Sequence, residues 1–380
     1  MSAHSNTNGH AASTSASSSS PHSESPLLSL DNAGQIAAFE AYYPKLRDTF
    51  LSYVSSQYGL PLSATDRLQR MFDYNILGGK YYRGTLVTST IQAVCRQKHL
   101  DIEEYWEGGL VAGWLIEVLQ AMFLVADDIM DRSVTRRGKP CWYRLPDVQF
   151  DAINDALILE SFLYHHLTQH FQHHPSYVQL MQLYQQVSLS TQMGQMLDLT
   201  SQPLGRRDAA ILHSFTLPMY TRIVTYKTAL YTFHLPLAAA LLLTGITSPS
   251  TLSHVNDIAV ALGIKFQIQD DFLDCFGLPE VIGKVGTDIR DHKCSWLVVQ
   301  ALQRCSKEQS ALLEASYGWD DEVQEKRVKA LYEELGLKAA FEQQEAESYA
   351  TIKAMVQEQS DELPQDMFMP VLNKIHLRQK

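Results

Sequence analysis

The sequence predicts an all-α protein, a single large bundle of roughly ten or more helices around a central apolar cavity. Two observations favour this fold class. Long segments carry apolar residues at three- and four-residue spacing, and short runs rich in Val, Ile and Thr between turn residues, which would indicate strands, are scarce. Several of the helical segments are apolar on almost every side, as is typical of helices surrounded by other helices.

The chain is expected to contain one folded domain preceded by a tail. Residues 1–30 are rich in Ser, including the run from Ser17 to Ser20. Such a segment cannot bury enough apolar surface to offset the entropy lost on ordering, so we predict that it is disordered. Residues 31–380 show neither a second linker nor a short repeat, and 45% of the whole chain is hydrophobic, which is ample for a large core.

The clearest helical patterns lie at residues 108–130, 151–170, 178–199 and 251–276. Short segments containing Gly or Pro separate the helical regions, for example at 77–79, 137–140 and 277–279. Short connections of this kind are typical of helices that pack against their neighbours in the chain. The four segments are therefore expected to form the centre of the bundle.

Composition and charge exclude several classes of protein. The net charge of −11 argues against a nucleic-acid-binding protein, because such proteins present basic surfaces. The five cysteines are odd in number and form no C-x-x-C pair, which is typical of reduced thiols in the cytoplasm. The most apolar run, residues 235–243, is far shorter than the roughly 20 residues of a membrane-spanning helix. No Lys or Arg precedes Lys45, so we expect a cytoplasmic protein without an integral membrane segment.

Two Asp-Asp-x-x-Asp motifs follow long apolar stretches. The first begins at Asp127 and ends at Asp131, and the second begins at Asp270 and ends at Asp274. On a helix, the first and last carboxylates of each motif lie one turn apart on one face, where they would repel each other unless a cation lies between them. Mg²⁺ prefers such oxygen ligands and bridges carboxylates to substrate phosphates.

A solvated acidic helix end would explain one such motif about as well as a metal site does. It does not explain two, because residues 115–126 and 258–268 in front of the motifs belong in a core. The carboxylates are therefore expected to lie at the mouth of a buried apolar space. This arrangement suits a ligand with a polyanionic head and a hydrocarbon tail.

Basic residues flank both motifs. Two adjacent arginines follow the first motif, a Gly-flanked segment with two cations precedes it at residues 78–84, and two lysines follow the second. Arginine forks match phosphate oxygens, and glycines allow the backbone to approach an anion closely. Each cation alone would more often be an ordinary surface charge; their position beside both acidic motifs makes them candidate phosphate ligands. They are Lys80, Arg83, Arg136, Arg137, Lys284 and Lys293.

Six motifs, taken together, resemble the trans-isoprenyl diphosphate synthase family, and within it the eukaryotic, fungal-like farnesyl diphosphate synthases. They lie at residues 78–84, 124–131, 135–143, 226–229, 266–274 and 283–289, in the order expected of that family. The resemblance runs from about residue 35 to the C-terminus. It implies a Mg²⁺-dependent prenyltransferase of the isoprenoid synthase type, which joins isopentenyl diphosphate head to tail with dimethylallyl and geranyl diphosphates.

The resemblance also implies roles for individual residues. Asp127, Asp131 and Asp270 would hold Mg²⁺, three ions in this family, which grip the diphosphate of the allylic substrate. The remaining residues fall into two diphosphate-binding sets and one set that stabilises the allylic carbocation. The allylic diphosphate would be contacted by Arg136, Lys227, Lys284 and Lys293. The isopentenyl diphosphate would be contacted by Gly79, Lys80, Arg83, Gln120 and Arg137. The carbocation would be stabilised by the Lys227 carbonyl, Thr228 and Gln267. The basic terminus that closes over the second site in this family would be represented by Arg378 and Lys380.

One position departs from the family pattern. The two residues that floor the product pocket are usually aromatic, whereas here they are Met122 and Phe123. Phe123 lies one turn before Asp127 and can block the growing chain, while Met122 is unbranched and makes a softer wall. Two hypotheses follow: a C15 product with some leakage to C20, or a clean C15 product if another side chain fills the space.

Three alternatives share parts of this pattern. A geranylgeranyl or geranyl diphosphate synthase would use the same machinery, and differ in product length. A terpene cyclase shares the fold and a first Asp-rich motif, but usually lacks a second one such as that at Asp270 and the cations Lys80 and Arg83. An inactive regulatory paralogue would typically lack some metal ligands or basic residues, and none is lost here. The family also leads us to expect a homodimer.

Overall fold

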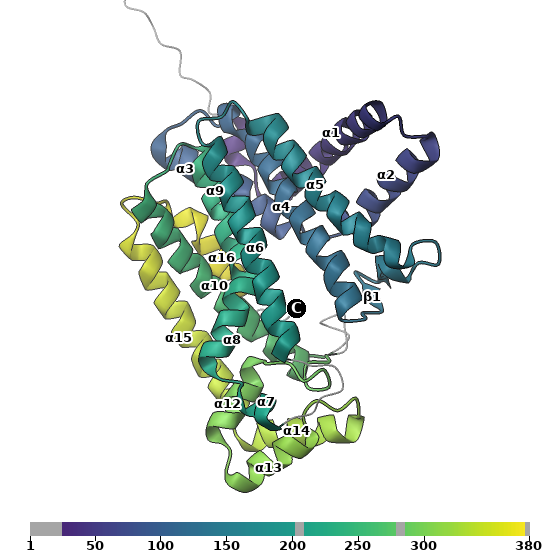
Figure 1. Ribbon diagram of the computed structural model, residues 1–380. Coiled ribbons are helices and arrows are strands. Elements are labelled where there is room, and N and C mark those ends of the chain that lie inside the picture. Colours follow the sequence, from purple (N-terminus) through teal and green to yellow (C-terminus); the bar gives the residue numbers. More distant parts are fainter. Residues whose placement is uncertain (1–24, 202–208, 279–285, 377–380) are drawn as a thin grey trace, which may run out of the picture.

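The computed structural model describes residues 25–201, 209–278 and 286–376, and these fold as a helical bundle (Figure 1). The predicted all-α architecture is confirmed. The helices and strands, in chain order, are η1 Pro26–Ser29, α1 Asn32–Tyr58, α2 Leu62–Ile76, α3 Tyr82–Lys98, α4 Glu103–Met130, β1 Thr135–Arg136, β2 Lys139–Pro140, η2 Trp142–Arg144, η3 Gln149–Asp151, α5 Ala152–Phe171, α6 Tyr177–Ser201, α7 Ala209–His213, α8 Leu217–Val224, η4 Thr225–His234, α9 Leu235–Leu243, α10 Pro249–Phe276, α12 Trp296–Arg304, α13 Lys307–Ser316, α14 Glu322–Glu334, α15 Leu337–Glu358, η5 Gln365–Met367 and α16 Met369–Ile375.

All four predicted helices are present, as α4, α5, α6 and α10. Among the described residues, strand pairing is confined to the small hairpin of β1 and β2, in which Arg136 lies opposite Lys139. This hairpin directly follows the first Asp motif. It folds the chain back so that the arginines after the motif lie beside the end of α4.

Helix α4 is the centre of the bundle, packed against α3, α5 and α9. Trp114 on α4 is fully buried, stacks on Phe39 of α1 with 4.2 Å between ring centroids, and donates from Nε1 to the Phe39 carbonyl oxygen at 2.7 Å. Helices α3 and α4 approach so closely that a Cβ on Gly113 would lie 2.5 Å from the carbonyl oxygen of Gly84. By length and composition α4 could cross a membrane, but 78% of its most apolar 18-residue segment is buried inside the fold, as is usual for a core helix.

The other helices surround this centre in two groups. Helices α12, α13 and α14 form a smaller apolar cluster with α8 and the end of α10. Helices α9, α10, α15 and α16 form another cluster against α3, on the side where the described chain ends (Figure 1). The end of α4 carries the first Asp motif and leads into the β1–β2 hairpin, and the end of α10 carries the second motif.

The prediction of disorder for residues 1–30 is wrong for the last residues of that segment. Residues 1–24 lie outside the described residues, but Pro26–Ser29 form the 3₁₀-helix η1. Gln92 donates to the carbonyl oxygens of Leu27 at 2.8 Å and Leu30 at 3.1 Å, and Leu27, Leu28 and Leu30 pack against the core. Apolar side chains therefore fix residues 25–30 to α3, although the composition of residues 1–30 as a whole is that of a tail.

Candidate active site

The first Asp motif ends α4, with Asp131 as the helix cap. Carboxylates at a helix C-terminus oppose the helix dipole, and here Arg136 compensates them. Its Nε donates to the buried Asp128 at 3.0 Å, and its Nη2 lies 3.4 Å from Asp127. Burial and, secondarily, the charge of Asp127 raise the pKa of Asp131. Arg136 thus holds Asp128 most closely and also lies beside Asp127, one of the two predicted ligands.

In the second motif, two of the three carboxylates accept hydrogen bonds from backbone N–H groups. Asp271 is buried and accepts from the Trp296 backbone N–H at 2.7 Å; burial raises its pKa. Asp274 accepts from the backbone N–H of Asp288 at 3.0 Å. The sequence placed Asp270 and Asp274 on one helix face as possible partners, but Asp274 is used to fix the chain after α10. Asp270, the residue predicted as a ligand, is half-buried.

A π-helix, η4, carries Lys227 and Thr228 into the space between the motifs. It is held between two glycines: a Cβ on Gly194 of α6 would lie 2.2 Å from the Lys227 backbone nitrogen, and a Cβ on Gly263 of α10 would lie 2.2 Å from the Cβ of Ala229. Such distances are far below van der Waals contact. The backbone of η4 can therefore approach both neighbouring helices only because these two positions lack side chains.

The Lys227 ammonium lies between two helices. Its Nζ donates to Asp198 on α6 and lies 3.7 Å from Asp127 on α4. Asp127 also accepts from Gln195, on α6 as well, at 2.9 Å. The positive charge of Lys227 thus joins the first motif to a carboxylate outside both motifs.

The predicted carbocation-stabilising residues form a hydrogen-bonded chain. The Thr228 hydroxyl donates to Gln267 Oε1 at 3.2 Å, and Gln267 Nε2 donates to Asp271 at 2.9 Å. Because Asp271 is itself fixed by a backbone N–H, each group in the chain has a defined orientation. The oxygen dipoles of Thr228 and Gln267 are therefore oriented before any ligand binds.

Lys293 lies among carboxylates from both sides of the site. Burial opposes its charge, but the surrounding carboxylates outweigh burial and raise the pKa of Lys293. In decreasing order of effect, they are Asp288, Asp198, Asp131 and Asp127. The field in this space is therefore strongly negative and favours cations.

A second group of polar residues surrounds Arg83 on α3. Arg83 donates to Thr232 Oγ1 at 3.1 Å and to the Tyr231 hydroxyl at 3.0 Å. With the Gln120 amide oriented by its neighbours, its oxygen accepts from Arg83 at 3.0 Å and its nitrogen donates to Glu117 at 3.2 Å. Gln120 thus lies beside Arg83, as the resemblance implied, and the guanidinium is held rigidly by both neighbouring helices.

Arg137 reaches the same region from the β1–β2 hairpin. Its Nη1 donates to the carbonyl oxygens of residues 75–77, and a Cβ on Gly79 would lie 3.1 Å from its Nη2. Lys80 is exposed, and its charge lowers the pKa of Lys374 on α16, after the larger effect of burial. The structure therefore brings Gly79 and Arg137 together and adds Lys374 near Lys80. Lys284, Arg378 and Lys380 lie outside the described residues.

An apolar cavity of about 610 Å³ opens between α4, α5, α6 and η4. Met122 and Phe123 line it, the latter with its ring edge toward Tyr231 at 6.1 Å between centroids, and Asp127 and Lys227 lie on its wall. The predicted chain-length residues and the predicted metal ligand therefore share one cavity, which joins a charged mouth to an apolar interior.

Several residues of this site were not predicted. Gln195 and Asp198 lie three residues apart on α6, and this spacing was the available signal. Glu117, buried within α4 and accepting from the Gly84 N–H at 2.9 Å, could have been noticed as an isolated charge in an apolar helix. Lys374 carried no signal in the sequence.

The sequence pattern of the polyprenyl synthetase family matches residues 65–335. The chain belongs to the polyprenyl synthetase family. It is 47% identical to the farnesyl pyrophosphate synthase of Mus musculus over 317 residues, which cover 83% of this chain and 89% of the mouse protein. It is 42% identical to the farnesyl pyrophosphate synthase of Schizosaccharomyces pombe over 346 residues, covering 90% and 98% of the two chains.

Solved structures of the polyprenyl synthetase family share the fold. A farnesyl diphosphate synthase of T. brucei in complex with a bisphosphonate superimposes with a TM-score of 0.84 at 35% identity. The match covers 91% of this chain and all of that one. The fold expected from the resemblance is therefore shown by structure as well as by sequence.

Proposed function

We propose that the protein makes farnesyl diphosphate, by condensing isopentenyl diphosphate first with dimethylallyl diphosphate and then with geranyl diphosphate. The observation that carries this proposal is the cavity of about 610 Å³, apolar inside and bounded by Asp127 and Lys227 at its charged end. A diphosphate at the charged end would place its prenyl chain in the apolar interior. The farnesyl pyrophosphate synthases among the relatives favour this product over geranylgeranyl diphosphate, and over a cyclase or an inactive paralogue.

Members of this family use a divalent metal, and the residues present fit Mg²⁺. The donor set is all oxygen, and the carboxylates around Lys293 already stabilise a cation. Among the described residues, no three His, Cys, Asp or Glu side chains form a ready-made metal site. Mg²⁺ characteristically takes one or two carboxylates together with substrate phosphates, so the diphosphate would complete the coordination. Asp127, Asp131 and Asp270 would hold the ions, three by analogy with the family.

When bound, the metal ions neutralise charge that develops on the leaving diphosphate. The residues of the chain bind the two diphosphates and stabilise the carbocation. The allylic diphosphate is bound by Arg136, Lys227 and Lys293, and by Lys284, which lies outside the described residues. Isopentenyl diphosphate is bound by Lys80, Arg83 and Arg137, with Gly79 and Gln120 beside them.

The allylic C–O bond breaks and its electron pair leaves with the diphosphate. The oriented oxygens of Thr228, Gln267 and the Lys227 carbonyl stabilise the carbocation. The double bond of isopentenyl diphosphate attacks the cation to form the new C–C bond. The intermediate then loses a proton to the departed diphosphate, which restores a double bond, and the apolar walls exclude water that would otherwise capture the cation.

A product assay tests the function. Purified protein is incubated with labelled isopentenyl diphosphate and a C5, C10 or C15 allylic primer, with and without Mg²⁺. We expect metal-dependent conversion of the C5 and C10 primers to C15, and little extension of the C15 primer. Substantial C20 would reassign the enzyme as a mixed-length synthase, and no condensation with any primer would contradict the prenyltransferase assignment.

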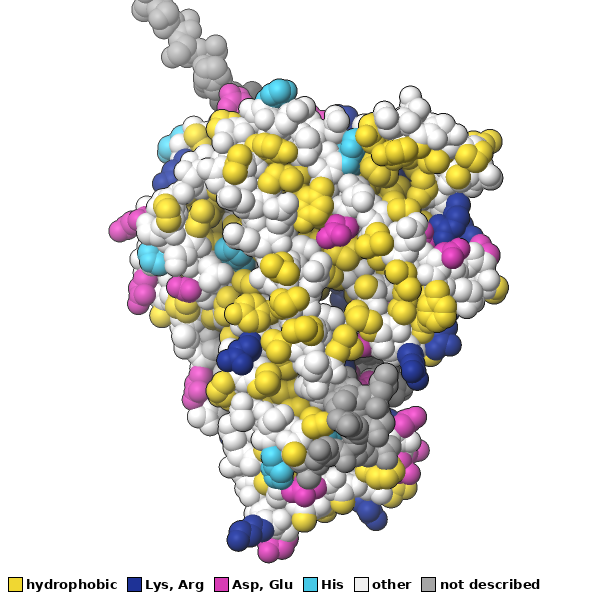
Figure 2. All heavy atoms as spheres, viewed as in Figure 1, with side chains coloured by type: hydrophobic (Ala, Val, Ile, Leu, Met, Phe, Trp, Pro, Cys, Tyr) yellow, Lys and Arg dark blue, Asp and Glu magenta, His cyan; other side chains and the backbone are white. Residues whose placement is uncertain are grey.

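We further infer that the protein is a cytoplasmic homodimer that pairs through α5 and α6. Exposed apolar side chains lie on both helices, among them Ile153, Leu157, Leu189 and Met196. Figure 2 shows many hydrophobic side chains on the side of the molecule that α5 and α6 face. A contiguous exposed apolar patch is typical of an interface. Light scattering after gel filtration should give twice the chain mass for the wild type. Leu189→Glu should shift it toward the monomer, and Leu62→Glu, at a similarly exposed leucine on α2, should not.

A further inference from the structure

A buried ion pair lies outside the active site, between α10 and α15. Lys265 and Glu345 are 1% and 3% exposed, and their charged groups lie 2.5 Å apart. Lys265 also donates to the Glu345 carbonyl oxygen at 3.1 Å and to Ser348 Oγ at 3.3 Å. A buried ion pair is often no more stabilising than apolar side chains of the same volume. Stability alone is therefore a poor explanation for this pair.

The same carboxylate oxygen of Glu345 accepts two further hydrogen bonds. Gln269 on α10 donates to it at 2.8 Å, and the His376 Nδ1, just after α16, lies 3.0 Å from it. Gln269 donates to the carbonyl oxygen of Ile375 as well. One carboxylate thus joins α10, α15 and the residue after α16: it contacts His376 directly, and Ile375 is tied to it through Gln269.

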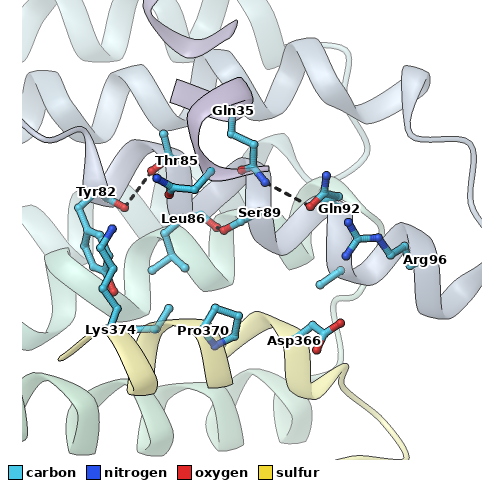
Figure 3. A pocket seen from close by; sticks show the side chains of 13 residues that line it. Gln35, Tyr82, Thr85, Leu86, Ser89, Gln92, Arg96, Asp366, Pro370 and Lys374 are labelled. Atoms are coloured by element: carbon cyan, nitrogen blue, oxygen red, sulfur yellow. Dashed lines mark hydrogen bonds between the residues drawn. The ribbon is translucent and has the colours of Figure 1, made fainter. Parts of the chain in front are cut away.

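Both ends of this network lead to the active site. Gln269 immediately precedes Asp270, the predicted metal ligand at the end of α10. At the other end, α16 carries Lys374, whose Nζ lies 4.5 Å from the centre of the Tyr82 ring. Figure 3 shows α16 running along α3, with Lys374 reaching Tyr82 beside a cavity of about 380 Å³. Tyr82 lies between Lys80 and Arg83, the predicted ligands of isopentenyl diphosphate.

We propose that Glu345 is a positioning residue for the isopentenyl diphosphate site. By anchoring His376 directly, and Ile375 through Gln269, it fixes the end of α16 and thereby holds Lys374 against Tyr82 and beside Lys80. Two like charges held close together favour a bound anion, so an ordered Lys374 strengthens the positive field at this site. A loose α16 would lose that field while leaving the allylic site unchanged. The proposal rests on the proposed function, because it deepens the assignment of Lys80 and Arg83.

The first test replaces His376, whose side chain is 30% exposed and can be truncated without opening the core. Calorimetric titration of the protein with isopentenyl diphosphate measures binding without turnover. We expect His376→Ala to weaken this binding about tenfold, the usual effect of losing one hydrogen bond to a charged group. His376→Asn keeps an N–H donor and should restore most of the affinity. The KM for geranyl diphosphate should be unchanged in both.

Two further variants separate positioning from stability. Gln343→Ala removes an exposed hydrogen bond to Glu347 at 2.7 Å within α15, without touching Glu345 or α16, and should bind isopentenyl diphosphate like the wild type. The double variant Lys265→Met with Glu345→Leu replaces the ion pair by apolar groups, and should keep its thermal unfolding midpoint while losing affinity.

The outcomes distinguish this proposal from the proposed function. Unchanged isopentenyl diphosphate affinity in His376→Ala and in the folded double variant would overturn the positioning role alone. Wild-type protein that binds isopentenyl diphosphate but condenses it with no primer would overturn the proposed function alone. Wild-type protein that does not bind isopentenyl diphosphate would overturn both.

Discussion

Two carboxylates of one motif serve different purposes although they lie one helical turn apart. We propose that Asp270 holds a metal ion, whereas Asp274 accepts from the Asp288 backbone N–H. We expect Asp270→Asn to lower kcat/KM about 100-fold or more, because it removes charge from the metal site, with little change in the thermal unfolding midpoint.

Asp274→Ala should show the opposite pattern and thereby serves as its control. Leaving the half-buried N–H of Asp288 without this acceptor should cost about 1 kcal/mol of stability while the folded enzyme keeps most of its turnover. Steady-state kinetics and thermal unfolding of both variants give the comparison. If Asp274→Ala loses turnover with an unchanged midpoint, the assignment of the two carboxylates is wrong.

We expect product length to depend on single side chains of the apolar cavity. Met122 and Phe123 both line it, and Met122 is the more deformable wall. If the cavity leaks toward C20, Met122→Phe should lower the ratio of C20 to C15, as measured by chromatography of the labelled products. Phe123→Ala, which enlarges the same cavity, should raise that ratio. An unchanged ratio in Met122→Phe would mean that Phe123 and the surrounding walls already set a C15 product.

At the scale of elements, the π-helix depends on close packing at two glycines. Gly263→Ala would bring two Cβ atoms to 2.2 Å, so we expect destabilisation by about 1–3 kcal/mol and lower kcat as Lys227 and Thr228 shift. Adding Ala229→Gly removes the opposing Cβ but leaves the Ala229 Cα, which would lie 2.6 Å from the added Cβ, so it should recover part of the loss. This non-additive recovery is measured by denaturant unfolding of both single variants and the double variant.

The second glycine gives the matched control. At Gly194 the added Cβ would meet the backbone nitrogen of Lys227 rather than a side chain. Ala229→Gly should therefore fail to rescue Gly194→Ala. Equal rescue of both alanine variants would show that Ala229→Gly acts on η4 generally, and not through the space beside Gly263.

Elements with strong periodicity were predictable from the sequence, and their local distortions were not. Apolar spacing alone predicts α4, α5, α6 and α10 within a few residues at each end. The π-helix at Thr225–His234 has the same kind of apolar pattern as these α-helices. What distinguishes it is close packing against Gly194 and Gly263, which lie on helices distant in the chain. The ordered turn at Pro26–Ser29 was missed because its stability comes from Gln92, not from its own composition.

The site was predictable to the extent that its chemistry is local in the sequence. The Asp motifs and the flanking cations are contiguous, so their types and spacing are visible. The different uses of Asp270 and Asp274 depend on a backbone N–H on the far side of a connecting segment. Likewise, the pairing of Lys227 with Asp198 depends on how α6 packs against η4. Partners of this kind follow from packing and not from sequence spacing.

At the scale of the whole molecule, a buried histidine predicts how stability depends on pH. His166 on α5 is 0% exposed and packs 4.4 Å from the Phe162 ring, and burial, aided by the charges of His170 and His165, lowers its pKa to about 3. The unfolded chain binds this proton near pH 6.5 but the folded chain does not. Stability is therefore full above about pH 6.5, and falls as the pH drops, by about 2 kcal/mol between pH 7 and pH 5 from this group.

Denaturant unfolding at a series of pH values measures this dependence. His166→Phe, which keeps an aromatic ring without the titrating group, should flatten the curve between pH 7 and pH 5 relative to the wild type. His173→Asn, at an exposed histidine near the end of the same helix, should leave it as it is. An identical slope in wild type and His166→Phe would show that His166 is not kept neutral in the fold.

The π-helix also bears on which changes the gene can tolerate. A π-helix holds more residues per turn than an α-helix, so losing one codon within Thr225–His234 need not unfold the segment, which can tighten into an α-helix. The residues on one side of the deletion would then rotate by about 100° relative to those on the other. Lys227 and Thr228 could no longer face Asp198 and Gln267 together. An in-frame loss of one codon here should therefore give a folded but inactive protein, whereas the same loss in a surface connection should be nearly silent.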